Sequence, residues 1–332
     1  MQLNTKLNAS ITAVGGYVPE HRLSNKDLEQ IVDTNDEWIQ SRTGIKERRI
    51  LKDPSKATSF LAIQASKNLI SKNNIDPLTI DMVIVATTTP DMQIAATAAY
   101  VASEIGSYNA FGYDLQAACS GFLYAMSMAS GKIESGRYKK VLVVGADKMS
   151  SVIDYKDRST CILFGDGAGA VLFESNNEGL GWQDEYFKSN GDGRESLNVK
   201  AGGSLFPATS TTISNRDHYL RQDGRKVFKT AVSAMSDASS TILKRNNLVG
   251  EDIDYLVAHQ ANERIIESIA KRMSLKPSKV LKNIAKYGNT TAATIPLLLY
   301  DFQNKFKRGN KIIFAAFGGG FTWGAAYYIW SK

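Results

Sequence analysis

The feature that most constrains the fold is an internal repeat, in which three kinds of segment each occur twice, about 170 residues apart. The pairs are 81–85 with 254–258, the strand–turn–helix pattern at Cys119 with that at Asn289, and 140–144 with 311–315. The run around 81–85 is rich in β-branched residues, which is typical of a buried parallel strand. We therefore predict two α/β halves, residues 1–175 and 176–332, packed around a pseudo-twofold axis.

Chemically distinctive residues follow the paired strands, and they differ between the two halves. Cys119, His259 and Asn289 stand at three of these positions, and a glycine-rich turn stands at a fourth. Ligand sites in α/β sheets lie outside the carboxyl ends of the strands. Packing the halves around a pseudo-twofold axis would bring these strand ends together, so we expect one shared site.

Cys119 lies in DLQAACSGFLYAM, where an apolar strand over 110–115 passes through small residues into a helical pattern. Peptide dipoles at a helix start favour a thiolate over a thiol, which predicts a nucleophile. Ala117, Ala118 and Gly121 leave room for a substrate carbonyl and a sharp turn. The alternative is a buried core cysteine.

The chain has three histidines, and only His259 ends an apolar strand before a polar helix start, HQANE. It is either a functional group or a satisfied structural histidine. Asn289, in YGNTT, is either a turn residue with positive φ or a catalytic residue. Because an amide cannot act as an acid or base at neutral pH, a catalytic Asn289 would donate a hydrogen bond to developing negative charge.

Trp38 and Arg42 are four residues apart in a predicted helix and therefore share a face. An indole beside a guanidinium can stack a purine or bind phosphate, although a core tryptophan beside a solvated arginine is the simpler interpretation. Two further segments carry weaker patterns. Residues 176–225 predict loops and short elements between the halves, and residues 280–284 predict a short strand.

Several classes of protein are disfavoured. No basic block is interleaved with aromatic residues, so the net charge of +7 does not indicate a nucleic-acid partner. No apolar run approaches a membrane span, no signal peptide is read at the start, and two cysteines predict a reducing cytoplasm without disulfides. No His/Cys/Asp cluster has metal-ligand spacing. GDGAGA and FGGGFTWG lead into strands, which excludes a dinucleotide loop, and no CGSCW-like signature supports a papain-like hydrolase.

Long motifs in a fixed order give the chain its clearest resemblance. They are VDTNDEWIQSRTGIKERR, ATTTPD, DLQAACSGF, DRSTCILFGDGAGA, HQANERII, GNTTAAT and FGGGFTWG. Together they resemble β-ketoacyl-acyl-carrier-protein synthase III of the thiolase-like superfamily. The resemblance implies a thiolase-like α/β fold with two pseudo-symmetric βαβαβ halves in α-β-α-β-α layers, and a cytoplasmic homodimer without a cofactor.

The resemblance also implies a reaction, the decarboxylative condensation of an acyl-coenzyme A primer with malonyl-acyl carrier protein. The primer would be acetyl-coenzyme A or a short branched acyl-coenzyme A, and Cys119 would carry it as a thioester. By resemblance the site comprises His259 and Asn289 as donors to the enolate, Gly319 with the Cys119 amide as oxyanion hole, Trp38, Arg42 and Arg158 for coenzyme A, Gln260, Ala261, Asn262, Glu263 and Arg264 for carrier-protein docking, and Ile94 and Phe317 in the acyl pocket.

Two positions depart from the frequent family pattern. Ile94 stands where many members carry an aromatic ring that closes the neighbouring subunit's acyl pocket, and Arg225 stands where some carry asparagine. A related thiolase-superfamily synthase remains an alternative, but no catalytic glutamate stands out near Cys119. A non-catalytic binding subunit is a second alternative, and the presence of Cys119, His259 and Asn289 argues against it.

Overall fold

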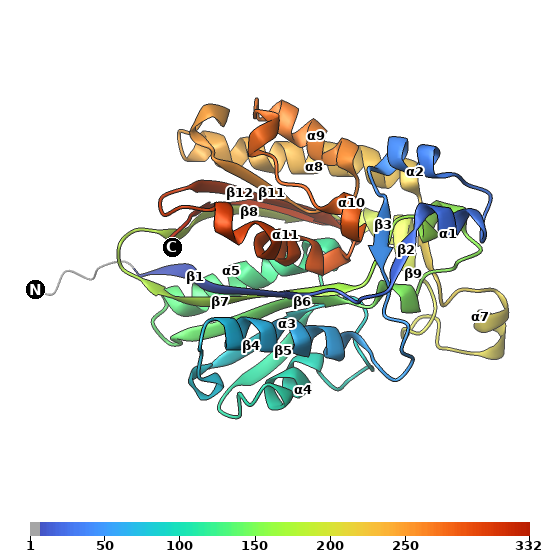
Figure 1. Ribbon diagram of the computed structural model, residues 1–332, viewed down its shortest axis with the longest axis horizontal. Coiled ribbons are helices and arrows are strands. Elements are labelled where there is room, and N and C mark those ends of the chain that lie inside the picture. Colours follow the sequence, from blue (N-terminus) through green and yellow to red (C-terminus); the bar gives the residue numbers. More distant parts are fainter. Residues whose placement is uncertain (1–6) are drawn as a thin grey trace, which may run out of the picture.

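Helices and sheets alternate in α-β-α-β-α layers in the computed structural model, which describes residues 7–332 (Figure 1). One outer layer holds α3 (Thr58–Lys72) and α4 (Thr97–Glu104), and the other holds α8 (Gly224–Arg245) and α9 (Glu263–Arg272). The central layer consists of α5 (Gly121–Glu134) and α11 (Thr294–Phe302). The layered thiolase-like architecture expected from the sequence is therefore confirmed.

The two sheets share a succession of four strands, to which the first sheet adds a fifth at one edge. The first runs β1 (Asn8–Tyr17), β7 (Gly167–Asn176), β6 (Lys140–Asp147), β4 (Met82–Ala86), β5 (Phe111–Leu115). The second runs β8 (Gly181–Ser189), β13 (Thr322–Ile329), β12 (Lys311–Gly318), β11 (Tyr255–Ala258). Each sheet has a parallel part, formed by β6, β4 and β5 in the first sheet and by β12 and β11 in the second. The remaining pairs are antiparallel: β1–β7 and β7–β6 in the first sheet, β8–β13 and β13–β12 in the second. The repeat in the sequence thus corresponds to a repeat in topology, whereas the division at residue 175 stays a prediction.

Two segments differ from their sequence-based expectation. Strand β8, of nine residues, lies within 176–225, where we expected loops and short elements. Because β8 is an edge strand, its polar sequence, GWQDEYFKS, can leave one side to solvent. Residues 280–284 form no strand. Only Val280 makes a bridge, parallel to Leu256, before the chain enters α10 (Ile284–Tyr287). Val280 thereby lies beside β11 as β5 lies beside β4.

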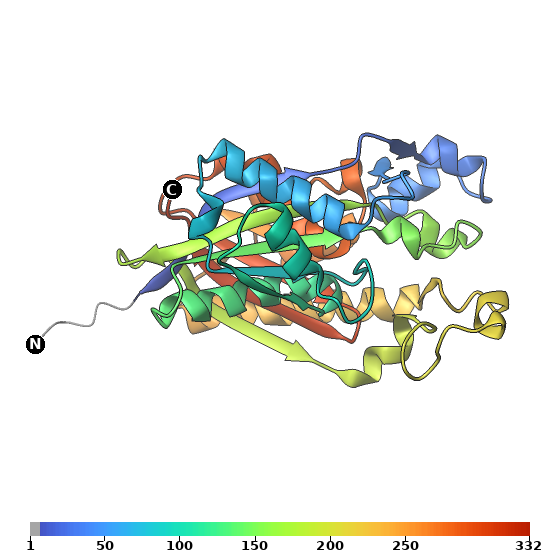
Figure 2. The same cartoon turned by 90° about the horizontal axis from the view of Figure 1, so that it is seen from below.

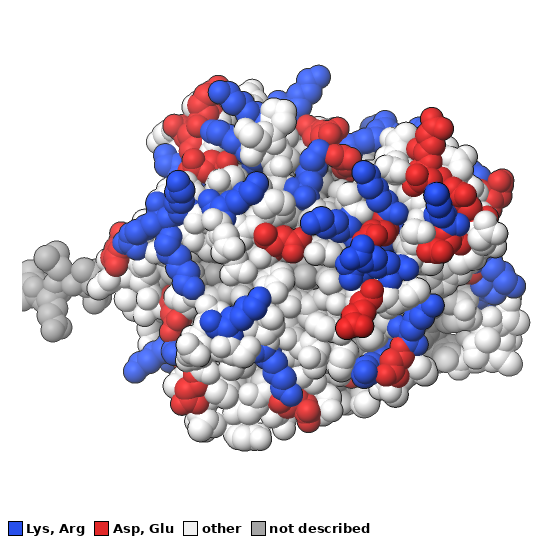
Figure 3. Space-filling model, viewed as in Figure 1, with Lys and Arg blue, Asp and Glu red and all other residues white. Residues whose placement is uncertain are grey.

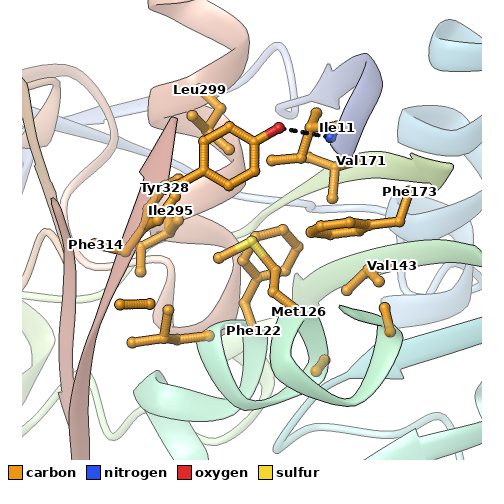
Figure 4. Close-up of a cluster of buried hydrophobic side chains, with 14 of the residues drawn as sticks. Ile11, Phe122, Met126, Val143, Val171, Phe173, Ile295, Leu299, Phe314 and Tyr328 are labelled. Carbon is orange, nitrogen blue, oxygen red and sulfur yellow. Dashed lines mark hydrogen bonds between the residues drawn. The ribbon is translucent and has the colours of Figure 1, made fainter. Parts of the chain in front are cut away.

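Side chains of the two central helices and of both sheets form one buried hydrophobic cluster between the sheets (Figure 4). Phe122 and Met126 of α5 and Ile295 of α11 are fully buried or nearly so, and they pack among side chains of both sheets. Each such residue contributes about 1.5–3 kcal/mol through burial. The Tyr328 hydroxyl also accepts the Ile11 N–H at 2.7 Å, which joins the second sheet to the first. The loops that follow the strand ends are therefore supported by a well-packed core of sheets and helices.

Shorter elements cap the end of the molecule opposite to the start of β1 and the C-terminus (Figures 1 and 2). A Ser24–Asp27 capping box begins α1. Among residues 7–332, no helix is long and apolar enough to cross a membrane. The cap elements are α1 (Asn25–Glu29), α2 (Asp36–Thr43), α6 (Arg158–Cys161), α7 (Ser210–Ser214), β2 (Arg22–Ser24), β3 (Glu47–Arg49), β9 (Leu197–Val199) and β10 (Leu220–Gln222).

Candidate active site

Two cavities meet at Cys119. The larger one, of about 790 Å³, is also lined by His259 and Asn289, so the structure brings together the three residues that follow strands of different halves. The smaller one, of about 570 Å³, is lined by Gly319 and Phe164 as well as Cys119. A substrate entering the larger cavity would therefore reach the sulfur, with a second space beyond it.

Cys119 lies in a sharp turn just before α5 and is only 7% exposed. Ala118 adopts a left-handed φ of 48° there, and Gly318 of β12 approaches so closely that a Cβ would lie 2.7 Å from the Cys119 nitrogen. Burial, followed by the negative charge of Asp147, raises the pKa of the Cys119 thiol to about 12. Hydrogen bonds from Asn289 and from the cysteine's own amide lower it by less. The lowered pKa expected at a helix start is thus outweighed by desolvation.

The Asn289 amide has a fixed orientation. Its oxygen accepts the Thr291 N–H at 2.8 Å, which leaves the NH₂ group as the donor toward Cys119. The Asn289 main chain makes two hydrogen bonds. Its N–H donates to the Leu163 carbonyl at 2.8 Å, and its carbonyl accepts the Gly165 N–H at 3.0 Å. The positive φ values of this turn belong to Gly288 and Thr291. Asn289 is thus placed as a donor.

His259 follows β11 and is 2% exposed. Burial lowers the pKa of its imidazole to about 3, so the ring is neutral at physiological pH. Nδ1 lies 2.7 Å from the Thr294 hydroxyl, which can instead donate to the Thr291 carbonyl at 3.0 Å. The Thr294 hydroxyl has one hydrogen to donate. If it goes to Nδ1, Nε2 carries the ring hydrogen and is itself a donor.

The residues expected to bind coenzyme A surround one indole. Trp38 and Arg42 of α2 both line the larger cavity, as their spacing predicts. The Arg158 guanidinium lies 5.1 Å from the Trp38 ring centre and donates to the Asp33 carbonyl at 2.8 Å. Arg158 therefore flanks the platform rather than lining the cavity. Phe317, expected in the acyl pocket, is buried in the wall of the larger cavity.

The segment expected to dock a carrier protein is only partly available. Gln260 is fully buried, donating to the Ala258 carbonyl at 2.8 Å and accepting from the Asn283 N–H at 3.1 Å, so its side chain cannot reach a partner. Asn262 caps α9 and bonds the Arg42 carbonyl, and Glu263 pairs with Lys282. Ala261 and Arg264 line the larger cavity, and Arg264 is exposed.

Ile94 lines neither cavity of its own chain. Its side chain is fully exposed, and its φ of 76° lies in the left-handed region. The Gln93 side chain beside it donates to the Gly202 carbonyl. A role for Ile94 in an acyl pocket would therefore require a second subunit.

Sequence reasoning missed several residues of the site. Lys229, in the first turns of α8, lines the larger cavity beside Arg225, which the sequence had singled out, and no Asp or Glu does so among residues 7–332. Asp147, Thr291 and Thr294 were also overlooked. A lone acid at the end of the apolar run VLVVGAD was the available signal for Asp147, because the same logic identified His259. Within the described range, no three His, Cys, Asp or Glu side chains gather as a metal site.

Comparison with known proteins gives consistent matches. Residues 113–191 match the family model for 3-oxoacyl-[acyl-carrier-protein] synthase III, and residues 243–330 match that for its C-terminal part. A β-ketoacyl-[acyl-carrier-protein] synthase III from Bacteroides thetaiotaomicron is 53% identical over 325 residues, covering 98% of this chain and 97% of that protein. One from Chlorobium chlorochromatii is 52% identical, covering 98% and 100%.

Solved structures agree. The crystal structure of 3-oxoacyl-[acyl-carrier-protein] synthase III from Aquifex aeolicus matches with a TM-score of 0.89 at 40% identity, covering 97% of this chain and all of that one. The priming β-ketosynthase of the R1128 polyketide pathway matches with a TM-score of 0.90 at 30% identity, covering 100% and 99% of the two chains.

Proposed function

The chain belongs to the 3-oxoacyl-[acyl-carrier-protein] synthase III family, and from this premise we propose how its residues share the reaction. It is an acyltransferase, the condensing enzyme that initiates fatty-acid synthesis. Its substrates are an acyl-coenzyme A primer and malonyl-acyl carrier protein, and its products are 3-oxoacyl-acyl carrier protein, coenzyme A and CO₂. The reaction uses coenzyme A as a thioester substrate and draws on no resident cofactor.

In the first half-reaction, the Cys119 sulfur attacks the primer's thioester carbonyl. The C–S bond to coenzyme A breaks, and the departing thiolate takes up the proton released by Cys119. The amides of Cys119 and Gly319 stabilise the tetrahedral oxyanion. The smaller cavity receives the acyl chain. Because Gly318 lets the end of β12 approach the Cys119 turn, the two halves can supply one amide each.

In the second half-reaction, malonyl-acyl carrier protein enters by the larger cavity. Its carboxylate leaves as CO₂, and the electron pair of the broken C–C bond forms a thioester enolate. His259 Nε2–H and the Asn289 NH₂ donate hydrogen bonds to the enolate oxygen. This requires the Thr294 hydroxyl to donate to His259 Nδ1 rather than to the Thr291 carbonyl. The enolate carbon then attacks the acyl carbonyl, and the Cys119 thiolate leaves and is reprotonated. Two donors in a buried site are well suited to such a charge.

The larger cavity is suited to phosphate groups. Four basic side chains line it without an acidic one among the described residues: Arg42, Arg225, Lys229 and Arg264. Coenzyme A and the carrier protein's prosthetic arm both carry phosphate, and acyl carrier protein is acidic, so complementary charge favours both partners. On the face in Figure 3, basic and acidic side chains are interspersed, so the +7 charge forms no single block there. We assign docking mainly to Arg264, with Ala261 beside it.

We also propose a cytoplasmic homodimer. Strand β5 is an edge of the first sheet, and its Phe111 side chain is 47% exposed. Tyr100 of α4 and the loop residues Met92 and Ile94 add exposed apolar surface on the same part of the chain. An open strand edge with apolar neighbours is suited to pairing with a second copy. Ile94 would then reach the acyl cavity of the other subunit.

The observation that carries the proposal is the convergence of Cys119, His259 and Asn289 on one cavity with a basic, acid-free lining. Intact-mass measurement after incubation with acetyl-, isobutyryl- and longer acyl-coenzyme A tests it. We expect one acyl adduct per chain that is absent from Cys119→Ala. An adduct that persists in Cys119→Ala, or no adduct with any primer, would contradict the proposal.

A further inference from the structure

A single buried carboxylate connects the two halves at the site. Asp147 ends β6 and is fully buried, and seven donors lie within hydrogen-bonding distance of its two carboxylate oxygens. Five reach Oδ1 from the hydroxyls and amides of Thr87, Thr88 and Thr89, which follow β4. Two reach Oδ2 from the Thr291 hydroxyl and the Ala292 N–H, at 3.1 Å for the latter, in the second half. No ligand or metal is needed to explain so complete a set of partners.

Thr291 is the residue through which Asp147 touches the catalytic groups. Its N–H holds the Asn289 oxygen at 2.8 Å, and its carbonyl lies 3.0 Å from the Thr294 hydroxyl. That hydroxyl in turn lies 2.7 Å from His259 Nδ1. Thr291 itself has a φ of 50°, an unfavourable value for a β-branched residue, which persists only where the surroundings hold it. The bonds to Asp147 are the obvious restraint.

We propose that Asp147 is a positioning residue that, through Thr291, holds Asn289 as a hydrogen-bond donor toward the enolate. This inference rests on the proposed function and deepens it. Asp147 touches neither substrate nor Cys119 in this scheme. It acts by fixing the amide orientation of Asn289.

The chemistry of the seven partners makes Asp147→Asn a sharp test. Both carboxylate oxygens accept at least one main-chain N–H: those of Thr88 and Thr89 on Oδ1, and that of Ala292 on Oδ2. An asparagine NH₂ would therefore face a main-chain donor in either orientation, and unlike a hydroxyl that donor cannot reverse its role. The side chain keeps its size, but it loses its main-chain hydrogen bonds either to the Thr88–Thr89 segment or to Ala292.

Asp114→Asn is a matched control. The Asp114 carboxylate also accepts one main-chain N–H on each oxygen, from Thr97 and Ala98 at 2.8 Å, at the start of α4. It makes no contact with Thr291. A generally weakened scaffold should affect both variants alike, whereas lost positioning should affect only Asp147→Asn.

The experiment measures both half-reactions in full-length protein: acetyl transfer from acetyl-coenzyme A to Cys119, and CO₂ release from malonyl-acyl carrier protein. For Asp147→Asn we expect CO₂ release to fall at least about tenfold while acetyl transfer stays within about threefold of wild type. Asp114→Asn should leave the ratio of the two rates unchanged. Equal loss of both rates in Asp147→Asn, or CO₂ release within twofold of wild type, would overturn the proposal.

Thr291 provides the second arm if Asp147→Asn does not fold. Thr291→Ser keeps the hydroxyl and should retain CO₂ release, whereas Thr291→Val keeps the shape and should lose it about tenfold. Equal rates in the two variants would overturn the proposal. A wild-type protein that performs neither half-reaction would instead contradict the proposed function, so the two failures are distinguishable.

Discussion

The two halves have the same strand topology but end their equivalent strands in different chemistry. In the first half, β4 leads to three threonines, β6 ends in Asp147, and the segment after β5 carries Cys119. In the second half, β11 leads to His259 and β12 to the glycines beside Cys119, and Asn289 follows the bridge at Val280. In the proposed reaction, one half thus presents a nucleophile and an anchoring acid, and the other presents neutral donors. Topology sets where the residues meet, and the side chains decide what each half contributes.

Burial shifts the pKa values of Cys119 and His259 in opposite directions, and both shifts favour the neutral form of the side chain. It raises the pKa of the Cys119 thiol to about 12 and lowers that of the His259 imidazole to about 3. Both groups are therefore neutral at physiological pH. The resting site is prepared to receive charge as it develops rather than to hold it beforehand.

The largest expected effect comes from removing the proposed nucleophile of the first half. Cys119→Ser should fold, because the two side chains are similar in size, but it should retain no acetyl group. We expect overall condensation to fall by at least about a thousandfold, since the nucleophile's loss removes the covalent step. Steady-state condensation with intact-mass detection measures this. Condensation at a comparable rate would show that the first half does not supply the nucleophile.

A smaller effect is expected where one subunit would complete the other. Ile94 leaves more space than a ring, and each methylene buried by a longer primer is worth about 0.8 kcal/mol. Ile94→Phe should therefore shift the ratio of kcat/KM values toward acetyl and away from isobutyryl by about tenfold. Competition between the two coenzyme A thioesters measures it. An unchanged ratio, with wild type strictly preferring acetyl, would exclude Ile94 from the acyl pocket.

Carrier-protein docking on the second half should show an effect of several-fold. Arg264→Glu reverses an exposed charge at the cavity mouth, so the KM for malonyl-acyl carrier protein should rise about fivefold at low salt and less at high salt. Acetyl transfer from coenzyme A should barely change, and Lys271→Glu, further along α9, should act in the same direction but more weakly. A defect independent of salt would argue against docking through charge.

The smallest expected effect concerns pH: His259 should not titrate between pH 5.5 and 8. Since the His259 pKa lies near 3, the ring stays neutral throughout the range from pH 5.5 to 8, and the rate of CO₂ release should show no inflection near 6.5 from this residue. The unfolded chain, with a histidine pKa of about 6.5, binds a proton that the folded chain does not, so His259 lowers stability as pH falls below 6.5. An inflection near 6.5 that His259→Gln removes would show a charged imidazole in the working site.

The sequence predicted the topology better than the local electrostatics. The repeat located the paired strands, and the strand-end argument expected Cys119, His259 and Asn289 in one site. It missed β8, because an edge strand needs little apolar sequence, and it gave 280–284 a strand where one bridge forms. The Cys119 pKa was expected to fall, since a helix start is visible in sequence but the degree of burial is not.

Residues that act through others were the hardest to foresee. Gln260 lies within a motif expected at the surface, yet its amide is used wholly inside the fold. Asp147 serves partners that are 60 and 144 residues away in sequence, at Thr87 and Thr291. Such contacts depend on how the halves pack and leave no local pattern.

The division of labour between the halves is tested most directly by measuring both half-reactions in Asn289→Ala. Loss of one oxyanion-type donor costs about 3 kcal/mol. We therefore predict that CO₂ release from malonyl-acyl carrier protein falls about a hundredfold, while acetyl transfer to Cys119 stays close to the wild-type rate. Equal loss of both half-reactions would contradict the account, because Asn289 would then serve the Cys119 step or the fold rather than the enolate.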